Sequence, residues 1–419
     1  MSMRLSNTNK VIVLVSAFAA MLFDGFELGL MPVASLSVTR DLLGEEYTIS
    51  NGGEWFARYT AGLMLGAAMG GIFLGQLGDR LGRAKGLGVS ILFYSVFAGL
   101  GAFVTTPMQM LLLRFLVGLG VGGVWPNSVA LVSECWPDKS KPMVAGLVGA
   151  ALNLGIFMLS LVGQSWHITP DSWRWLFHLA GAPAILGILM IIFLPESPEW
   201  IACDTSRRSG PGFKKDFPIL VLFKPPLVRM TITGIMLGTV PLVGAWAASK
   251  WMIPWADKVG GLIDPGYKAV TQSWWAFGAV VGSFFGAQIA AFLGRRFSYF
   301  IFSIGATTLT LLLFLCTAPL SGSFLPMVLA QGFVSTLFFG WLPLYLPELF
   351  PTRVRAAGSG ISYNSGRFIT AIGVFLSGTL FVFLGGSYSQ IGAVCGVIYL
   401  LGAFTIWFAP MPVSEDPTS

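Results

Sequence analysis

Apolar residues recur along the chain in twelve stretches, each long enough to cross the hydrocarbon core of a membrane. A spanning helix needs about 20 mostly apolar residues. The pattern predicts spans at 11–31, 55–77, 87–106, 108–133, 143–164, 173–194, 228–249, 271–293, 298–317, 324–347, 355–384 and 388–409. We therefore expect an all-α membrane protein with twelve transmembrane helices.

The longest polar break, residues 195–226, lies near the middle of the chain and is rich in Pro, Gly and basic residues. Such a composition is typical of a linker. The break predicts an N-terminal six-helix bundle (1–194), a cytoplasmic linker (195–226) and a C-terminal six-helix bundle with a short cytoplasmic tail (227–419).

The two predicted halves repeat one another. Glu134-Cys-Trp-Pro137 and Lys141 match Glu348-Leu-Phe-Pro351 and Arg355 at a constant offset, and Leu81-Gly82-Arg83 matches Leu293-Gly294-Arg295. A parallel repeat of six spans is a transporter architecture, with the substrate site near the midplane between two pseudo-symmetric bundles.

Composition agrees with a membrane protein. Of 419 residues, 55% are hydrophobic and only 11% charged, whereas soluble domains carry about 25% charged residues. This excludes a disordered protein, a basic nucleic-acid reader and a soluble enzyme with one anchor. The four scattered cysteines argue against a disulfide scaffold or a zinc site. We expect no cofactor, no nucleic-acid partner, and a monomer in a lipid bilayer.

The net charge of +6 is explained by topology. With the N-terminus inside, seventeen Lys and Arg fall in cytoplasmic segments, and the outer segments hold Arg40, Arg58, Arg174, Lys250, Lys258 and Lys268. This bias predicts cytoplasmic termini. The short loops and the small linker favour a plasma membrane, specifically a bacterial inner membrane.

Two acidic residues fall inside the first span. Asp24 lies ~20 Å along a helix that begins at Val11, and Glu27 follows on the same face. Ionisable residues at this depth are costly and each suggests a function. A carboxyl group in a low-dielectric environment takes up a proton more readily than one in water, so both acids are candidate proton carriers.

Two arginines are also intramembrane. Arg114 lies near the outer end of span four, and Arg367 lies ~18 Å along span eleven, with Tyr363 and Asn364 one turn earlier. A guanidinium stays charged and binds carboxylates bidentately. Arg367, Asn364, Tyr363 and Arg114 are therefore the candidate residues for binding an organic anion. Structural salt bridges with the two acids are the alternative, most of all for Arg114.

The loop between spans two and three carries the motif Gly75-Gln-Leu-Gly-Asp79-Arg80-Leu-Gly82-Arg83-Ala-Lys85. It resembles the signature loop of the major facilitator superfamily, although Ala291 replaces the acid in the second copy. Pro195-Glu-Ser-Pro198 and the segment Tyr345 to Arg355 resemble the sugar-porter and organic-ion branch. The resemblance covers essentially the whole chain and implies transport by alternating access.

The motif Asp24-Gly-Phe-Glu27 resembles the first span of the aromatic-acid:proton symporters. That resemblance implies functional roles for Asp24, Glu27, Arg114, Glu134, Arg355 and Arg367. Ser362-Tyr-Asn-Ser-Gly-Arg367 is also similar to span eleven of sialate and related carboxylate symporters. Both resemblances imply proton-coupled uptake of a small carboxylate, with the proton as coupling ion.

Charged residues near the cytoplasmic ends of the spans form a candidate latch. It comprises Asp79, Arg80, Arg83, Glu134, Lys141, Glu348 and Arg355. We expect these groups to pair with one another and with helix ends, for example Glu134 with Lys141 and Glu348 with Arg355. The alternative is solvated loop charges, each worth under about 1 kcal/mol.

Aromatic and amide residues give weaker signals. The tryptophans Trp251, Trp255, Trp274 and Trp275 bracket an outer loop and read mainly as an interfacial belt, with a wall for an aromatic ring as the alternative. The amides expected to be buried could bind a substrate or join helices; they are Asn127, Asn153, Gln288 and Gln331.

Competing functions remain open at this point. The sugar-porter-like loop fits a sugar or organic-cation carrier, but Arg367 would repel a cation. A drug exporter of the same fold and a non-transporting receptor derived from it are further alternatives. An enzyme is disfavoured because no Ser–His pairing, metal-ligand cluster or phosphate-binding loop occurs.

Overall fold

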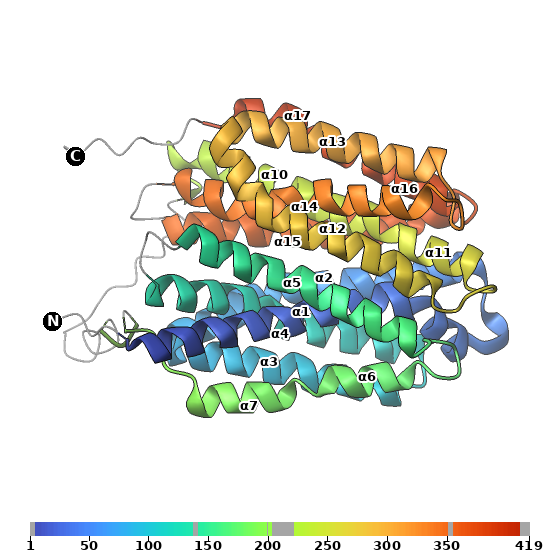
Figure 1. Cartoon of the computed structure of the whole chain (residues 1–419), viewed down its shortest axis with the longest axis horizontal. Helices are drawn as coiled ribbons and strands as arrows, with labels where there is room; N and C mark the ends of the chain where they lie inside the picture. Colours follow the sequence, from blue (N-terminus) through green and yellow to red (C-terminus); the bar gives the residue numbers. More distant parts are fainter. Residues whose placement is uncertain (1–4, 137–140, 199, 203–221, 351–354, 411–419) are drawn as a thin grey trace.

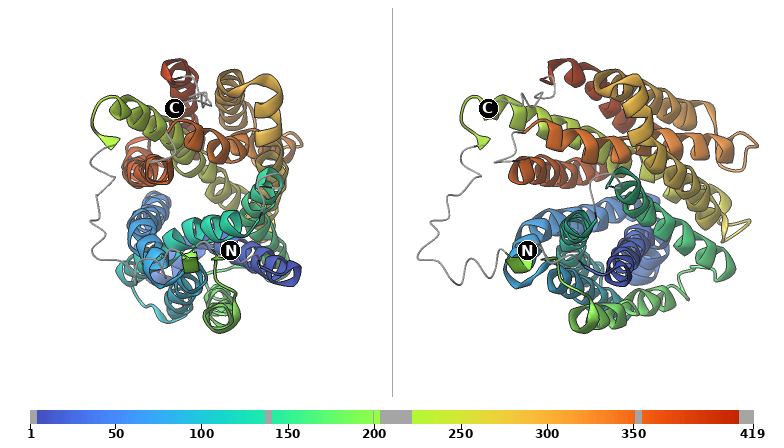
Figure 2. Two further views of the ribbon diagram at one scale, coloured as in Figure 1. Left: turned by 90° about the vertical axis from the view of Figure 1, so that its left-hand side faces the viewer. Right: turned by 60° about the vertical axis from the view of Figure 1, so that its left-hand side comes forward.

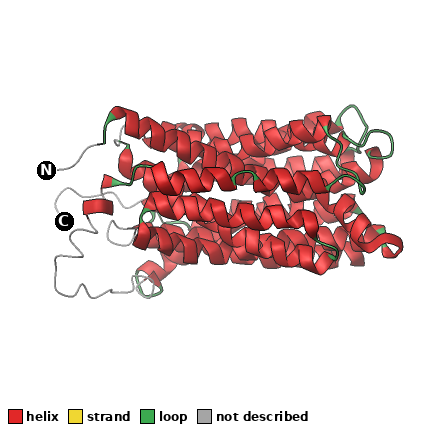
Figure 3. Cartoon of the chain, turned by 90° about the horizontal axis from the view of Figure 1, so that it is seen from below, coloured by secondary structure: helices red, strands yellow, loops and turns green. Residues whose placement is uncertain are grey.

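The computed structural model describes residues 5–136, 141–198, 200–202, 222–350 and 355–410. Side chains of a few further residues, among them Asp79, Lys141 and Arg355, lie outside this description. The described chain consists of helices joined by loops and turns, without strands (Figure 3). The described chain begins and ends at the same end of the molecule, called here the terminal face; the opposite end is the far face (Figure 1).

Twelve of the described helical segments are long and apolar enough to cross a membrane. The N-terminal half consists of α1 (Asn7–Leu43), α2 (Ile49–Leu81), α3 (Arg83–Leu100), α4 (Pro107–Cys135), α5 (Lys141–Ser165), α6 (Arg174–Gly181) and α7 (Ala184–Phe193). The C-terminal half consists of α10 (Leu227–Val243), α11 (Met252–Gly260), α12 (Tyr267–Leu293), α13 (Arg295–Cys316), α14 (Phe324–Glu348), α15 (Arg355–Phe383), α16 (Tyr388–Gly396) and α17 (Ile398–Thr405). The fold class predicted from the sequence is confirmed.

Short turns extend several of these helices. They are η1 (Gly44–Glu46), η2 (Gly101–Phe103), η4 (Gly244–Ala248), η5 (Ser249–Trp251) and η7 (Ile406–Phe408). The pairs α6–α7 and α16–α17 each form one span, as do α10 and α11 together with η4 and η5.

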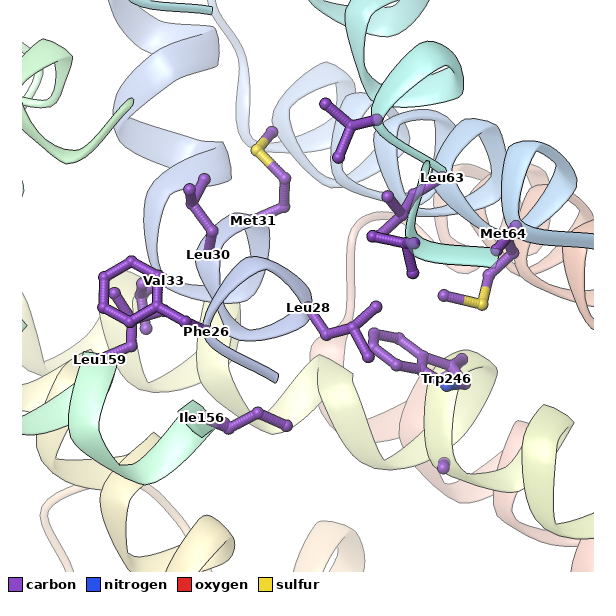
Figure 4. Close-up of a cluster of buried hydrophobic side chains, with 14 of the residues drawn as sticks. Phe26, Leu28, Leu30, Met31, Val33, Leu63, Met64, Ile156, Leu159 and Trp246 are labelled. Carbon is purple, nitrogen blue, oxygen red and sulfur yellow. The ribbon is translucent and has the colours of Figure 1, made fainter. Parts of the chain in front are cut away.

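The two halves form separate groups of helices when the molecule is viewed from its end (Figure 2). They meet along α2 against α15 and along α5 against α12. The apolar core continues across this boundary. Leu28 of α1 and Trp246 of η4 point toward one another, with Met64 of α2 beside the indole (Figure 4). The predicted linker, 195–226, falls largely outside the described residues.

The sequence repeat is visible as a repeat of turn geometry. Gly82 precedes α3 with φ +113°, and Gly294 precedes α13 with φ +85°. L-residues with side chains rarely adopt such values, so glycine fits both turns. Gly82 lies between α2 and α3, and Gly294 lies between α12 and α13, both at the terminal face. The two halves therefore have the same turn at corresponding positions.

Two spans end more than ten residues beyond the position that the apolar pattern predicted. The first continues twelve residues beyond position 31, to Leu43. Its extension contains Ser37 and Thr39, whose hydroxyls donate to the carbonyls of Ile168 (2.9 Å) and Ser35 (2.7 Å). Because these two hydroxyl groups are hydrogen-bonded, they can be buried, and the helix continues beyond the end that the composition predicted.

The seventh span likewise continues past position 249 to Gly260. Lys250, assigned to an outer segment by the charge count, is 1% exposed inside this span. That assignment was wrong. A lysine at the edge of an apolar run predicts the end of a span, but here the fold buries the lysine and the helix continues.

Candidate functional site

The first span presents both of its acids to the interior. Asp24 and Glu27 are each 1% exposed. Between them, Gly25 packs directly on α5, where a Cβ would overlap the carbonyl group of Leu152. Glycine at this position lets the two backbones approach closely, and the contact fixes the face of α1 that carries the acids.

Glu27 is paired with Arg114. The Oε1 atom of Glu27 accepts a hydrogen bond from the Nη1 group of Arg114, and both side chains are 1% exposed. The remaining atoms, Oε2 of Glu27 and Nε and Nη2 of Arg114, have no hydrogen-bond partner among the described residues. The salt bridge between Arg114 and Glu27 that the sequence offered as an alternative is therefore formed. Both side chains keep polar atoms that could form further hydrogen bonds.

Tyr94 of α3 joins these groups and was missed from the sequence. It is fully buried, and its hydroxyl lies close enough to Asp24 and Glu27 to interact electrostatically with both. A tyrosine in the middle of an apolar span, with a hydroxyl that needs a polar neighbour, was the signal that could have found it. It adds a proton-bearing group beside the two acids.

Within the described part of the chain, Asp24 has no ion-pair partner in direct contact. Neither of its carboxyl oxygens has a hydrogen-bond partner among the described residues. The charged groups that interact with it electrostatically are Arg367 from the other half and Glu27 from its own helix. Asp24 thus lies near enough to Arg367, across the boundary between the halves, for their charges to interact.

Arg367 is only 8% exposed and crosses that boundary. Its Nη1 group donates one long hydrogen bond, 3.5 Å, to the carbonyl oxygen of Ala67 on α2. Its guanidinium lies 5.2 Å from the ring centroid of Tyr363. No carboxylate of the described residues forms a salt bridge with it. Because a guanidinium carries five N–H donors, most of its capacity is free for a ligand.

The neighbours of Arg367 on α15 also reach the other half. Tyr363 stacks on Trp125 of α4 with ring centroids 4.9 Å apart and an interplanar angle of 19°. Asn364 packs against Gly71 of α2. The structure therefore brings Arg367, Tyr363 and Asn364 together at the boundary between the halves, whereas Arg114 is engaged with Glu27 inside the N-terminal half.

Ion pairs at the terminal face repeat in both halves. The Nε atom of Arg83 lies 3.4 Å from Oε1 of Glu134. In the C-terminal half, Arg295 donates to both oxygens of Glu348, at 3.1 and 2.9 Å. The structure thus pairs each glutamate with the arginine that begins the third or ninth span. Arg80 is exposed.

The expected pairs of Glu134 with Lys141 and of Glu348 with Arg355 involve side chains outside the described residues, as does the role of Asp79. Glu196 adds a contact that the sequence did not predict. Its carboxylate accepts hydrogen bonds from the backbone N–H groups of Arg83 (2.8 Å) and Ala84 (3.2 Å) at the beginning of α3.

Toward the far face, hydrogen bonds join the two halves. Lys268 of α12 donates to the hydroxyl of Ser37 on α1 at 2.9 Å. Gln272 donates to the carbonyl of Gly29 at 3.0 Å and to the hydroxyl of Ser160 at 3.1 Å. These contacts hold α12 against α1 and α5 on the far side of Asp24.

The amides considered from the sequence join helices where they are buried. Asn153 donates to Ser283 across the boundary at 2.7 Å, Asn127 donates to the carbonyl of Leu74 at 3.2 Å, and Gln331 donates to Ser249 at 2.6 Å. Gln288, in contrast, is exposed.

The expected interfacial belt is only partly correct. Trp274 is 38% exposed, but Trp251 and Trp275 are 1% and 3% exposed. Trp251 stacks on Phe381 with ring centroids 4.8 Å apart. Both tryptophans belong to the interior. Trp251 packs on Phe56 of the N-terminal half, and Trp275 donates to Gln331 of α14 within the C-terminal half.

Residues 13–261, more than half of the chain, match the family model described as Major Facilitator Superfamily. The chain belongs to this superfamily. It is therefore an integral membrane transporter and not an enzyme.

Similar proteins agree with this membership. The chain is 28% identical over 413 residues to the cis,cis-muconate transport protein of Acinetobacter baylyi, and the alignment covers 94% of each protein. It is 25% identical over 399 residues to the benzoate transport protein of the same organism, covering 88% of this chain and 83% of that protein. Resemblance to the aromatic-acid transporters of the superfamily, predicted from the first span, is confirmed.

Among solved structures, the superfamily's proton:xylose symporter bound to 6-bromo-6-deoxy-D-glucose superimposes with a TM-score of 0.73. The superposition covers 97% of each chain at 15% sequence identity. This similarity supports the fold of the transporter, and its substrate has to be argued from the residues of the site.

Proposed function

We propose that the protein imports a small organic acid, as its carboxylate, together with protons. The transport would proceed by alternating access through the inner membrane of a bacterium, with both termini in the cytoplasm. The observation that carries this proposal is the state of Arg367, a buried guanidinium at the boundary between the halves with a single long hydrogen bond and no acidic partner among the described residues.

The chemistry of Arg367 favours an anion over a sugar or an organic cation. A guanidinium binds a carboxylate bidentately and repels a cation. The ring of Tyr363, stacked on Trp125, lies beside the guanidinium and could contact an aromatic or unsaturated acid. The names of the muconate and benzoate transport proteins support this substrate class.

Asp24 supplies the coupling in this proposal. Its carboxyl group has no hydrogen-bond partner among the described residues, and it interacts electrostatically with Arg367. With a proton on Asp24 and an anion on Arg367, the net charge of the pair is zero. The loaded halves can then rock about the site without stranding a charge in the membrane.

Glu27 and Arg114 have a different role in this proposal. Their ion pair keeps the interior of the N-terminal half neutral while Asp24 changes its charge. Tyr94, close to both acids, can relay a proton between them. The residues at the terminal face, Arg83 with Glu134 and Arg295 with Glu348, would act as the latch that closes that side.

A binding screen tests the substrate class. The thermal midpoint of the purified protein would be measured with benzoate, cis,cis-muconate, xylose and choline, each at an acidic and an alkaline pH. We expect the two acids to raise the midpoint, and xylose and choline to leave it unchanged. Stabilisation by xylose without any response to the acids would overturn the proposal.

Replacement of the guanidinium tests the site. We expect Arg367→Ala to weaken benzoate binding by about 100-fold, as the loss of a bidentate charged contact predicts. Arg174→Ala is the control, since Arg174 lies at the far face and is bound to Asp41. Unchanged binding by a folded Arg367→Ala protein would remove Arg367 from the substrate site.

A further inference from the structure

Lys250 is a buried cation that the proposed mechanism does not use. It is 1% exposed and lies within the seventh span, Leu227–Gly260. Its ammonium group has no hydrogen-bond partner and no acidic partner among the described residues. An unpaired cation inside a membrane is costly, so an anion that binds beside Lys250 would stabilise it.

Two tryptophan rings surround the ammonium group. The Nζ atom of Lys250 lies 3.4 Å from the ring centroid of Trp275 and 5.6 Å from that of Trp246. A cation over the face of an indole is stabilised by the negative face of the ring. This contact orients the ammonium group but leaves its three donors without an acceptor.

The indole ring of Trp275, which lies under the ammonium group, is held in place by hydrogen bonds. The indole N–H of Trp275 donates to Gln331 at 2.9 Å, and Gln331 donates to Ser249 at 2.6 Å and to Thr310 at 3.2 Å. These bonds tie α12, α14, α13 and the seventh span together around one ring. A preorganised position of this kind is typical of a binding site.

The backbone at Lys250 is irregular. The seventh span passes from α10 through a π-helical turn at Gly244–Ala248 and a 3-10 turn at Ser249–Trp251 before α11 begins. Such turns within a helix occur frequently at functional sites. At membrane depth they are tolerated where the backbone is buried in protein or lines a cavity.

This position lies on the boundary between the halves, on the far side of Arg367. Trp246, one turn before Lys250, faces Leu28 of the other half (Figure 4), and the ring of Trp251 packs on Phe56 of α2. Lys250 lies ~35 Å along its span from Leu227, whereas Arg367 lies ~18 Å along α15 from its end at the terminal face.

We propose that Lys250, between Trp246 and Trp275, is a second anion-binding position. It would take the carboxylate of the transported acid between the far face and Arg367 when the far side opens. This inference rests on the proposed function. In the conformation described here, contacts of α12 with α1 and α5 close the far side, which explains why Lys250 is buried.

Sided transport kinetics test this assignment. The protein would be reconstituted in vesicles of known orientation, and the KM for labelled benzoate would be measured for entry from each face. We expect Lys250→Met to raise the KM for entry from the far face by about tenfold, as the loss of one charged hydrogen bond predicts. Entry from the terminal face should keep its KM, and Lys250→Arg should restore the far-face value.

Lys258→Met is the matched control. Lys258 lies eight residues further along the same span, also near an aromatic ring, with its Nζ atom 5.5 Å from the centroid of Tyr388, but it is exposed. We expect this variant to behave as the unaltered protein. A KM unchanged on both faces in Lys250→Met, or raised equally on both, would overturn the inference.

A labelling experiment covers the case in which Lys250→Met does not fold. In a Lys250→Cys protein whose four native cysteines are replaced by alanine, a membrane-impermeant thiol reagent on the far side should label position 250, and benzoate should slow the labelling. Absence of labelling during turnover, or labelling that benzoate does not slow, would contradict the inference. Failure of the unaltered protein to transport benzoate would overturn the proposed function itself, and this inference with it.

Discussion

Glu27 and Arg114 form an ion pair with both side chains withdrawn from solvent inside the N-terminal half. The pair joins α1 to α4 and lies one turn away from Asp24, which has no such partner among the residues that the structure describes. Two acids three residues apart on the same helix therefore have different surroundings. This difference separates a carboxylate that is engaged in an ion pair from one whose oxygens have no hydrogen-bond partner among the described residues.

Breaking the Glu27–Arg114 pair should destabilise the protein asymmetrically. Glu27→Gln leaves a guanidinium that stays charged, so we expect it to cost about 3 kcal/mol of unfolding free energy. Arg114→Gln should cost less, because the remaining carboxyl group can take up a proton. Chemical denaturation in detergent would measure both. Equal losses, or a double variant less stable than either single one, would contradict a pair of this kind.

Asp24→Asn should uncouple transport from the proton gradient. An amide cannot take up or release a proton, so we expect no benzoate accumulation driven by a pH gradient in proteoliposomes. Exchange of internal for external benzoate should persist, because the site keeps its shape and charge balance. Glu54→Gln, which removes a part-exposed acid near the far end of α2, is the control. Unaltered accumulation in the Asp24→Asn protein would move the coupling role to Glu27 or another group.

The fold could be predicted because its signals are repeated. Each span is an apolar run of membrane length, and the motifs at Arg83 and Arg295, or at Glu134 and Glu348, identify corresponding points of two halves. The boundaries of the first and seventh spans could not be predicted. They depend on tertiary contacts, such as the bond from Ser37 to the carbonyl of Ile168, that satisfy polar groups inside the helix.

The sequence identifies the charged residues of the candidate site, but it does not show which of them pair with one another. Intramembrane charge identified Asp24, Glu27, Arg114 and Arg367. The sequence could not say that Arg114 pairs with Glu27, since this depends on how α4 lies against α1. Lys250 was missed because a lysine at the edge of an apolar run reads as a residue at the water boundary.

The terminal-face ion pairs should affect transport more than stability. Arg295 and Glu348 are part-exposed, with 24% and 31% of their side-chain surfaces accessible, so Arg295→Gln should lower the unfolding free energy by less than about 1 kcal/mol. If the pair acts as a latch, the same variant should transport benzoate several-fold more slowly.

Arg58→Gln is the matched comparison for this latch. It removes an ion pair to Glu54 of similar exposure, 34% and 30%, toward the far face. We expect it to leave transport unchanged. Equal slowing by Arg58→Gln and Arg295→Gln would mean that the terminal-face pairs have no special role in closing that side.

The stack of Trp125 on Tyr363 should set how readily the terminal side opens. Trp125 lies in the part of α4 nearer the terminal face, and its ring contacts that of Tyr363 on α15. An aromatic pair contributes about 1 kcal/mol beyond its buried area. Trp125→Leu should therefore shift the equilibrium between a closed and an open terminal side about fivefold toward the open state.

Spin labels at Leu81 and Leu293, which are exposed at corresponding positions of the two halves, would report the separation of the halves at this face. We expect a larger fraction of long distances between the two labels in Trp125→Leu than in the control variant Trp166→Leu. The control alters an exposed tryptophan that follows α5. Identical distance distributions in the two variants would show that the stack does not restrain the terminal side.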